Sequence, residues 1–345
     1  MKRSTKLAAW TALGIGAVFA LRAAARARRR MEFAGRCVVI TGGSRGLGLE
    51  LARRFADEGA SLVLLARDEA TLAAARADLE WRGAPVLALA CDLRDPVAVR
   101  DAMREVRRRF GRVDVLVNNA GVMDVGPLQQ MGEDDFRAHM ELHAWAPLAL
   151  VREVVGPMRR QGSGRIVNIV SIGGRVAVPH MAPYTMSKFA LAGLSDALRA
   201  ELAGSNIRVT SVFPGLMRTG SHVQARFRGR ARREYGWFAA LAGTPLVSIS
   251  SARAARKIVE ACRHGDQVLI LTPQARLAVA LEGLAPALFA DIVSVSARLL
   301  PRAPVAGTGE RWTGWQARDN RKLLQVITAA ADRAATRNNQ RRPAS

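Results

Sequence analysis

The chain of 345 residues is long enough for one large domain with appendages or for two small domains. Its formal net charge of +23 at pH 7 would suit nucleic acid or an anionic membrane. The excess is greatest at the two ends, however, and no run interleaves Lys or Arg with aromatic residues, so no nucleic acid is expected as a partner. Cys37, Cys91 and Cys262 form no C-x-x-C pair, which indicates reduced, buried thiols in a cytosolic compartment. No cluster has metal-ligand spacing.

The N-terminus contains an uncharged apolar run, Leu7–Leu21, followed by five arginines before residue 31. These 15 residues are few for a membrane helix, but extension through Ala27 is long enough if Arg22 and Arg26 reach the interface. A cleaved signal peptide would fit the apolar length, although the positive charges behind it oppose export. A buried core helix is the third interpretation. We favour a membrane anchor over residues 1–30, with the rest of the chain in the cytoplasm.

A glycine-rich loop follows the first β-type run. The run C-V-V-I-T ends at Thr41, the loop reads G-G-S-R-G-L-G, and a helical pattern continues to Gly59. This order is the context that a dinucleotide site requires, because Gly42, Gly46 and Gly48 would allow a tight turn and the close approach of a pyrophosphate to a helix N-terminus. Three further β-type runs, each followed by a helical pattern, predict an α/β fold with a doubly wound parallel sheet, a Rossmann fold.

The end of the second β-type run bears on which dinucleotide binds. A carboxylate there would accept hydrogen bonds from the adenosine ribose and select NAD. Here the residues are Ala66 and Arg67, and Arg45 in the glycine loop adds a second cation. Two arginines suit a 2′-phosphate, so NADP(H) is expected in preference to NAD(H). The alternative is a solvated Arg67 that Asp68 partly neutralises.

Ser171, Tyr184 and Lys188 form the expected catalytic group. Ser171 follows the apolar run R-I-V-N-I-V, so its hydroxyl should lie at the carboxyl end of a strand, where ligands bind in parallel sheets. Tyr184 and Lys188 are four residues apart and would share one helix face. The Lys ammonium is expected to lower the pKa of the phenol and make it a usable acid or base. An ordinary exposed helix pair is the alternative for that motif alone.

Together these motifs resemble those of the short-chain dehydrogenase/reductase family, over roughly residues 33–272. The matching stretches are T-G-G-S-R-G-L-G at 41–48, C-D-L at 91–93, N-N-A-G at 118–121, Ser171, Y-T-M-S-K at 184–188 and P-G-L-M-R-T at 214–219. The resemblance implies that N-N-A-G lines the floor beneath the adenosine and stabilises the sheet. It also implies that Lys188 hydrogen-bonds the nicotinamide ribose.

Further cofactor contacts are implied by the same resemblance. Asp92 and Leu93 would contact the adenine, and Pro214, Gly215 and Thr219 would hold the nicotinamide carboxamide. With the glycine loop and the arginines, the expected cofactor-binding residues are Gly42, Ser44, Arg45, Gly46, Leu47, Gly48, Arg67, Asp92, Leu93, Asn118, Ala120, Gly121, Tyr184, Lys188, Pro214, Gly215 and Thr219.

One position departs from the family pattern. The family has an Asn in the helix after N-N-A-G, which supports a water between the catalytic Lys and solvent, and here His143 takes that place. A neutral His has one donor and one acceptor, so His143 could hold a water or relay a proton, and we include it among the catalytic candidates. A packing role is the equally weighted alternative, and an offset of the alignment is another.

Two later regions have less specific patterns. Residues 221–243 are Arg-rich, and their aromatic residues are Phe227, Tyr235, Trp237 and Phe238. The resemblance implies a mobile lid here, whose aromatics wall an apolar pocket or, alternatively, face the core. After the last β-type run, Q-V-L-I-L-T, residues 275–300 are expected to form a helical pair that covers the core or lies on a bilayer surface. The final R-N-N-Q-R-R-P-A-S is expected to be disordered.

The sequence therefore predicts an anchor with a basic flank (1–30), a single catalytic domain (31–272) and a helical extension with a basic polar tail (273–345). The expected function is NADP(H)-dependent interconversion of a carbonyl and an alcohol on a lipophilic substrate, in which Ser171 stabilises the oxyanion and Tyr184 transfers the proton. The alternatives are a hydroxysteroid-type dehydrogenase working oxidatively and a non-catalytic, cofactor-sensing membrane protein. The resemblance also implies a homo-oligomer.

Overall fold

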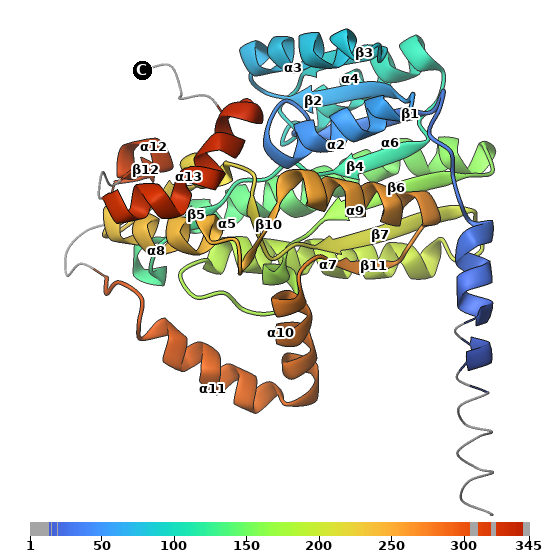
Figure 1. Cartoon of the computed structure of the whole chain (residues 1–345). Helices are drawn as coiled ribbons and strands as arrows, with labels where there is room; N and C mark the ends of the chain where they lie inside the picture. The colour runs from blue at the N-terminus through green and yellow to red at the C-terminus, as the bar shows by residue number, and fades with distance from the viewer. Residues whose placement is uncertain (1–13, 15, 19, 304–309, 319–321, 341–345) are drawn as a thin grey trace, which may run out of the picture.

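A parallel sheet of seven strands forms the centre of the molecule (Figure 1). The computed structural model describes residues 14, 16–18, 20–303, 310–318 and 322–340. In spatial order the strands are β11 (Val268–Ile270), β7 (Ile207–Phe213), β6 (Gly164–Ile169), β4 (Val115–Asn118), β1 (Cys37–Thr41), β2 (Ser61–Ala66) and β3 (Val86–Ala90). The order reverses after β1, so the predicted doubly wound α/β fold is confirmed, and each predicted strand is present.

The central strands form because they are apolar on both faces. In β2, the side chains of Leu62 and Leu64 join one core cluster, whereas Val63 and Leu65 join the cluster on the opposite side of the sheet. All four are fully buried. Burial of one such side chain contributes about 1.5–3 kcal/mol, so an uninterrupted aliphatic strand is stable only where helices cover both faces.

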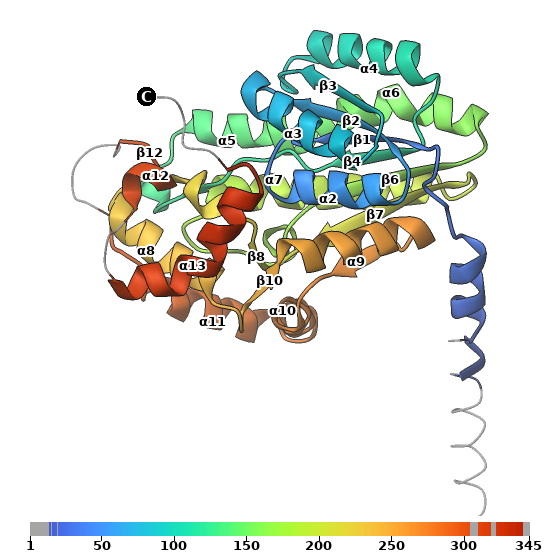
Figure 2. The same cartoon turned by 45° about the horizontal axis from the view of Figure 1, so that its top comes forward.

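Helices cover the two faces of the sheet in separate layers (Figures 1 and 2). One layer consists of α2 (Gly46–Asp57), α3 (Glu69–Trp81) and α9 (Ser251–His264). The other consists of α4 (Pro96–Phe110), α6 (Ala146–Arg160) and α7 (Ala182–Glu201). Their apolar residues fill the two clusters that the strands begin. The carboxyl ends of the strands are left uncovered by these layers, and the site lies there.

Short elements surround that end of the sheet. They are β5 (Asp124–Val125), α5 (Glu133–Met140), β8 (Leu216–Arg218), β9 (Arg226–Phe227), α8 (Ala231–Gly243), β10 (Ser248–Ser250), α10 (Pro273–Leu284), α11 (Pro286–Ala297), β12 (Trp312–Thr313), α12 (Gly314–Ala317) and α13 (Lys322–Arg337). β12 pairs with β9 and β9 with β5, while β10 pairs with β8.

The region after residue 272 divides into two parts that differ in packing. Helices α10 and α11 extend away from the body, and α11 has no buried residue, so the prediction that this pair covers the core is wrong (Figure 1). Helix α13 instead packs against α8 and leads back to the glycine loop. Residues 337–340 at its end are ordered, with Asn338 fully buried, so the prediction of disorder is wrong for them.

The N-terminal region is described only in part. Most of the predicted anchor run, Leu7–Leu21, lies outside the described residues. Residues 20–28 are helical and mostly exposed, and Arg26 forms a two-bonded ion pair with Asp266 at 2.8 and 2.9 Å. Among the described residues no helix is both long enough and apolar enough to cross a membrane.

Candidate active site

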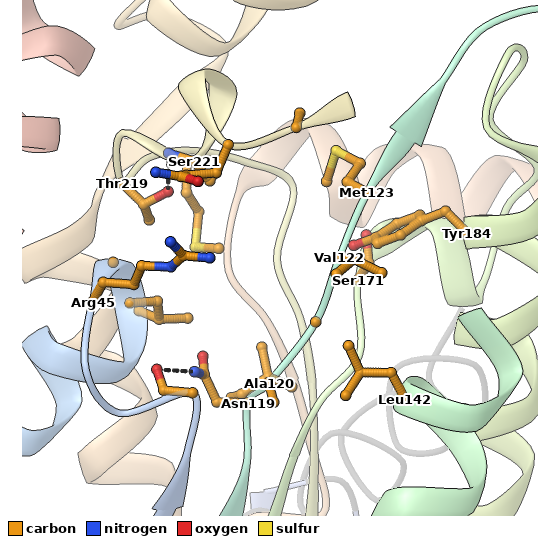
Figure 3. Close-up of a pocket in the computed structure, with 18 of the residues that line it drawn as sticks. Arg45, Asn119, Ala120, Val122, Met123, Leu142, Ser171, Tyr184, Thr219 and Ser221 are labelled. Carbon is orange, nitrogen blue, oxygen red and sulfur yellow. Dashed lines mark hydrogen bonds between the residues drawn. The ribbon is translucent and has the colours of Figure 1, made fainter. Parts of the chain in front are cut away.

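A cavity of about 750 Å³ opens at the carboxyl ends of the central strands. It is lined by the glycine loop before α2, by the ends of β2, β4, β6 and β7, and by the start of α7. Figure 3 shows Arg45 on one side of this cavity and Ser171 with Tyr184 on the other. The cavity therefore has a loop end and a catalytic end.

The glycine loop leaves open space at the start of α2, which side chains larger than glycine would occupy. Gly42 and Gly46 have φ values of 62° and 60°, in the left-handed region that favours glycine. A Cβ on Gly48 would come within 2.1 Å of the Gly42 carbonyl oxygen, so α2 can approach the loop only without that atom. The side-chain amide of Asn119 donates to the Thr41 carbonyl at 2.9 Å, and this bond fixes the loop to the end of β4. Backbone amides at the start of α2 are thus held close to the cavity, as a bound pyrophosphate requires.

The loop end of the cavity is cationic. Arg45 extends into it and Arg67 also lines it (Figure 3). Burial lowers the pKa of Arg45, the charge of Asp68 raises it in part, and the charge of Arg67 lowers it again. The nearest acidic residue, Asp68, accepts a hydrogen bond from the Thr71 amide at 2.7 Å and so caps α3. The partly buried Arg45 and the exposed Arg67 bring two positive charges to one end of the cavity, and the residues present therefore fit a phosphorylated nucleotide.

The adenine contacts implied by the resemblance, Asp92 and Leu93, both line the cavity. The Asp92 carboxylate forms an ion pair with Arg94, and that hydrogen bond lowers the pKa of Asp92 to about 2. Asp92 therefore stays ionised, and its charge is already compensated on the protein side.

The catalytic end brings together the three predicted side chains. The side chains of Ser171 and Tyr184 lie side by side in the cavity (Figure 3), and Ser171 Oγ accepts a hydrogen bond from the Gly173 backbone amide at 3.1 Å. Lys188 lies one helical turn after Tyr184, with its Nζ 5.7 Å from the centre of the phenol ring. This Nζ donates to the Ile169 carbonyl at 2.9 Å. All three residues line the cavity.

Burial determines the pKa values of Tyr184 and Lys188. The expected effect of Lys188 on Tyr184 is wrong. Lys188 was expected to lower the pKa of Tyr184, but burial raises the pKa of that phenol to about 12, and the bond with Ser171 opposes the rise only in part. Burial also lowers the pKa of Lys188 to about 7. The expectation fails because an ammonium ion is itself disfavoured in so apolar a place.

His143 lies on a π-helical turn, Glu141–Trp145, between α5 and α6. Its Nε2 accepts a hydrogen bond from the Val122 amide at 3.1 Å, so the ring proton of the neutral form is on Nδ1. Nδ1 lies 2.7 Å from Ser187 Oγ, which in turn donates to the Tyr184 carbonyl. Burial and the nearby Lys188 hold the pKa of His143 well below its ordinary value. Both ring nitrogens are therefore occupied by protein groups.

The predicted site residues mostly meet in this cavity. Those that line it are Gly42, Ser44, Arg45, Gly46, Leu47, Arg67, Asp92, Leu93, Ala120, Gly121, Ser171, Tyr184, Lys188, Pro214, Gly215 and Thr219. The residues Gly48, Asn118 and His143 do not line it. Gly48 acts in packing, and the amide of Asn118 donates to Asn168 at 2.8 Å, which joins β4 to β6 beneath the cavity.

The sequence did not identify the apolar wall around the catalytic group. This wall consists of Val122, Met123, Leu142, Val178, Met181 and Phe238. Of the four aromatics in 221–243, only Phe238 lines the cavity, while Phe227 and Tyr235 are buried in the core cluster beneath α12. These residues come from four separate stretches of the chain and carry no local signal, because only the fold brings them together.

A second missed residue is Gln340, near the end of the described chain, which lines the loop end of the cavity. An Asn-Asn pair after a helical run is a recognised signal for a helix C-cap, so the ordered turn before Gln340 had a signal in the sequence. No pattern in the sequence indicated that Gln340 lies close to the glycine loop.

This arrangement joins nucleotide binding to proton transfer in one cavity. That combination is what an oxidoreductase acting on CH–OH and C=O groups with NAD(P) needs. A family model described as short chain dehydrogenase matches residues 36–228. The chain therefore belongs to the short-chain dehydrogenase family, as its motifs suggested, and it is an enzyme of that class.

Individual relatives agree with this assignment. Dehydrogenase/reductase SDR family member 7B of Mus musculus is 33% identical over 291 residues, which make up 83% of this chain and 88% of the relative. L-Sorbose reductase from Gluconobacter frateurii, solved with NADPH and L-sorbose, has a TM-score of 0.63 and 30% identity over 70% of this chain and 97% of that one. A metagenomic short-chain oxidoreductase solved with NADP has a TM-score of 0.52 and 37% identity over 54% and 84% of the two chains.

Proposed function

We propose that this protein is an NADP(H)-dependent reductase of lipophilic ketones or aldehydes, with the catalytic domain in residues 31–272. The observation that carries the proposal is the single cavity with Arg45 at one end and the paired hydroxyls of Ser171 and Tyr184 at the other. Arg45 and Arg67 would hold the 2′-phosphate, which NAD(H) lacks. Two solved relatives carry NADPH or NADP, in agreement with this choice.

The chemistry divides between the cofactor and the side chains. When bound, the nicotinamide supplies the hydride. Ser171 hydrogen-bonds the substrate oxygen and stabilises the negative charge that develops on it. Tyr184 donates the proton to that oxygen, and a pKa of about 12 keeps the phenol protonated at neutral pH, as a proton donor must be. Lys188, beside Tyr184, would bond the nicotinamide ribose.

His143 acts in this proposal as a positioning residue. It joins the Val122 amide, on the loop that follows N-N-A-G, to Ser187 on the catalytic helix. Because both ring nitrogens are occupied and the ring stays neutral, His143 orients the loop and α7 and does not carry the proton.

The proposed substrate class rests on the apolar wall. Val122, Met123 and Phe238 among others surround the space next to Ser171 and Tyr184, and such walls retain apolar ligands. The test is a panel of lipophilic and hydrophilic carbonyls with purified full-length protein in detergent, following loss of NADPH absorbance. Turnover of lipophilic carbonyls is expected. Binding of NADPH without turnover of any member would favour the cofactor-sensing alternative.

We also propose that the protein is held at a membrane by residues 1–30, with the catalytic domain on the cytoplasmic side. Helices α10 and α11 support this, because they project from the same side of the body as residues 20–28 (Figures 1 and 2). Leu284 (87%) and Val295 (58%) on these helices, and Leu299 (84%) just after α11, are exposed apolar side chains that suit the boundary of a bilayer.

Flotation with vesicles of anionic and neutral lipid tests this second part. The full chain should float, and a chain without residues 1–30 should bind far more weakly. Residual binding of that truncated chain should fall further when Leu288→Asp and Ile292→Asp are added on α11. Equal flotation of all three proteins would contradict the anchor. An oligomer would have to leave α11 uncovered, which cross-linking on the vesicles can examine.

A further inference from the structure

The last described residues of the chain form part of the nucleotide end of the cavity. We call residues 337–340 the C-terminal strap. They lie about a hundred residues beyond the family match, which ends at residue 228, and they begin at the last residue of α13, drawn in red in Figures 1 and 2. The glycine-loop motif does not predict that a C-terminal segment lies beside it.

The strap is built by the end of α13. Asn339 has a φ of 56°, the left-handed conformation that ends many helices. The backbone N–H of Gln340 donates to the Ala335 carbonyl at 2.9 Å, and the backbone N–H of Asn339 donates to the Thr336 carbonyl at 3.3 Å. These two bonds form a Schellman motif, which turns the chain sharply and fixes the direction of Gln340.

Hydrogen bonds tie the strap to the glycine loop. The Gly46 amide donates to the Asn338 carbonyl at 2.9 Å. The side-chain amide of Asn339 donates to the carbonyls of Ser44 and Thr71, both at 3.0 Å. The strap therefore bridges the loop and the first turn of α3, on two sides of the cationic end of the cavity.

A further bond links the strap to α9. The fully buried Asn338 side chain donates to Ser251 Oγ at 3.2 Å, at the start of that helix. The strap is consequently anchored on elements of the catalytic domain, and its position does not depend on α13 alone.

Gln340 is the part of the strap that reaches the cavity. Only 7% of the residue is exposed, and its Oε1 is buried without a hydrogen-bond partner among the described residues. A Cβ placed on Gly46 would lie 2.8 Å from Gln340 Nε2, so the carboxamide lies directly against the start of α2. A buried carboxamide oxygen without a hydrogen bond is unfavourable, and a ligand that donates a bond to it removes that penalty.

We propose that Gln340 is a cofactor-binding residue, whose carboxamide hydrogen-bonds the phosphate–ribose part of NADP(H). The inference rests on the proposed use of that cofactor. A carboxamide suits this part of the ligand because its NH₂ donates to phosphate oxygens and its oxygen accepts from ribose hydroxyls. The extension after residue 272 thereby completes the nucleotide site, and the strap, through Asn339, holds Gln340 in place.

Equilibrium titration of NADPH into the full-length protein, read by the fluorescence of bound NADPH, tests the inference without turnover. Gln340→Leu keeps the size of the side chain and removes its polar atoms, and should raise the NADPH Kd about tenfold. Gln340→Glu should raise it further, because a carboxylate repels phosphate. Asn339→Gly retains the left-handed turn but loses the bonds to Ser44 and Thr71, and should have a smaller effect of about threefold.

The exposed Gln129, remote from the cavity, gives the matched control, and Gln129→Leu should leave Kd unchanged. Thermal midpoints without nucleotide show whether each variant is folded. Wild-type binding with an unchanged Kd for both Gln340 variants would overturn this inference and leave the proposed function standing. Tighter binding by Gln340→Leu would also overturn it, since the side chain would then obstruct the site. Failure of the wild type to bind NADPH would overturn the proposed function itself.

Discussion

The two ends of the cavity treat charge in opposite ways. At the loop end the two cations are Arg45 and Arg67, and an arginine such as Arg45 stays protonated even though burial lowers its pKa. At the catalytic end the cation is Lys188, and burial lowers its pKa to about 7. The loop end thus presents a permanent charge to an anionic ligand. At the catalytic end, burial brings the pKa of Lys188 close to neutral pH, so the charge of this lysine depends on which groups bind beside it.

The comparison predicts its largest effect at the catalytic end. Tyr184→Phe removes the proton donor and should lower kcat by about a thousandfold. NADPH affinity should change by no more than about threefold, because the loop end is untouched. Steady-state kinetics and fluorescence titration measure the two quantities. If more than about a tenth of the turnover remained, another acid would be transferring the proton.

Arg45→Ala tests the loop end. Loss of a charge-assisted bond should raise the Kd for NADPH about 10- to 100-fold and leave that for NADH nearly unchanged, since NADH has no 2′-phosphate. The control is Arg100→Ala, at an exposed position on α4 outside the cavity. Equal losses for both nucleotides would mean that Arg45 serves the pyrophosphate or the fold, and the contrast between the two ends would then weaken.

The protonation of Lys188 can be read from stability. Since its folded-state pKa is about 7, below the ordinary 10.5, the unfolded chain holds a proton in that range that the folded chain lacks. The free energy of unfolding therefore gains from this group as pH rises from about 7 to 10.5. Between these pH values, the free energy of unfolding of the wild type should rise relative to that of Lys188→Met by up to about 1.4 kcal/mol per pH unit.

Denaturant titrations without added nucleotide measure that difference, with Lys257→Met, at an exposed lysine, as the matched control. A difference between wild type and Lys188→Met that stayed constant from pH 7 to pH 10 would show that the buried amine does not titrate as proposed.

The smallest effect is expected at His143. His143→Asn keeps a donor and an acceptor and should retain activity within about tenfold, with an unchanged pH profile because the native ring stays neutral. His143→Ala leaves the Val122 amide and Ser187 Oγ without this partner and should cost about 1–3 kcal/mol of stability. A pH profile that shifted in His143→Asn would support the relay interpretation instead.

Most of the site could be predicted because its motifs are local. A strand that ends in a glycine loop already determines which groups face the sheet edge, and a four-residue spacing already places Tyr184 and Lys188 on one helix face. The predictions that failed concern what surrounds a residue. Asn118 is not one of them, because its bond to Asn168 on the neighbouring strand stabilises the sheet as the motif implies. The pKa of Tyr184 depends on burial, which spacing does not report.

Local patterns were enough to predict the doubly wound sheet, the glycine loop and the Ser–Tyr–Lys group, because each pattern consists of residues close together in the chain. Tertiary structure alone decided which apolar residues wall the substrate space, how burial distributes charge between the two ends, and that Gln340 lies against Gly46. Those outcomes depend on contacts between residues up to about 300 positions apart, and such contacts exist only once the layers have packed.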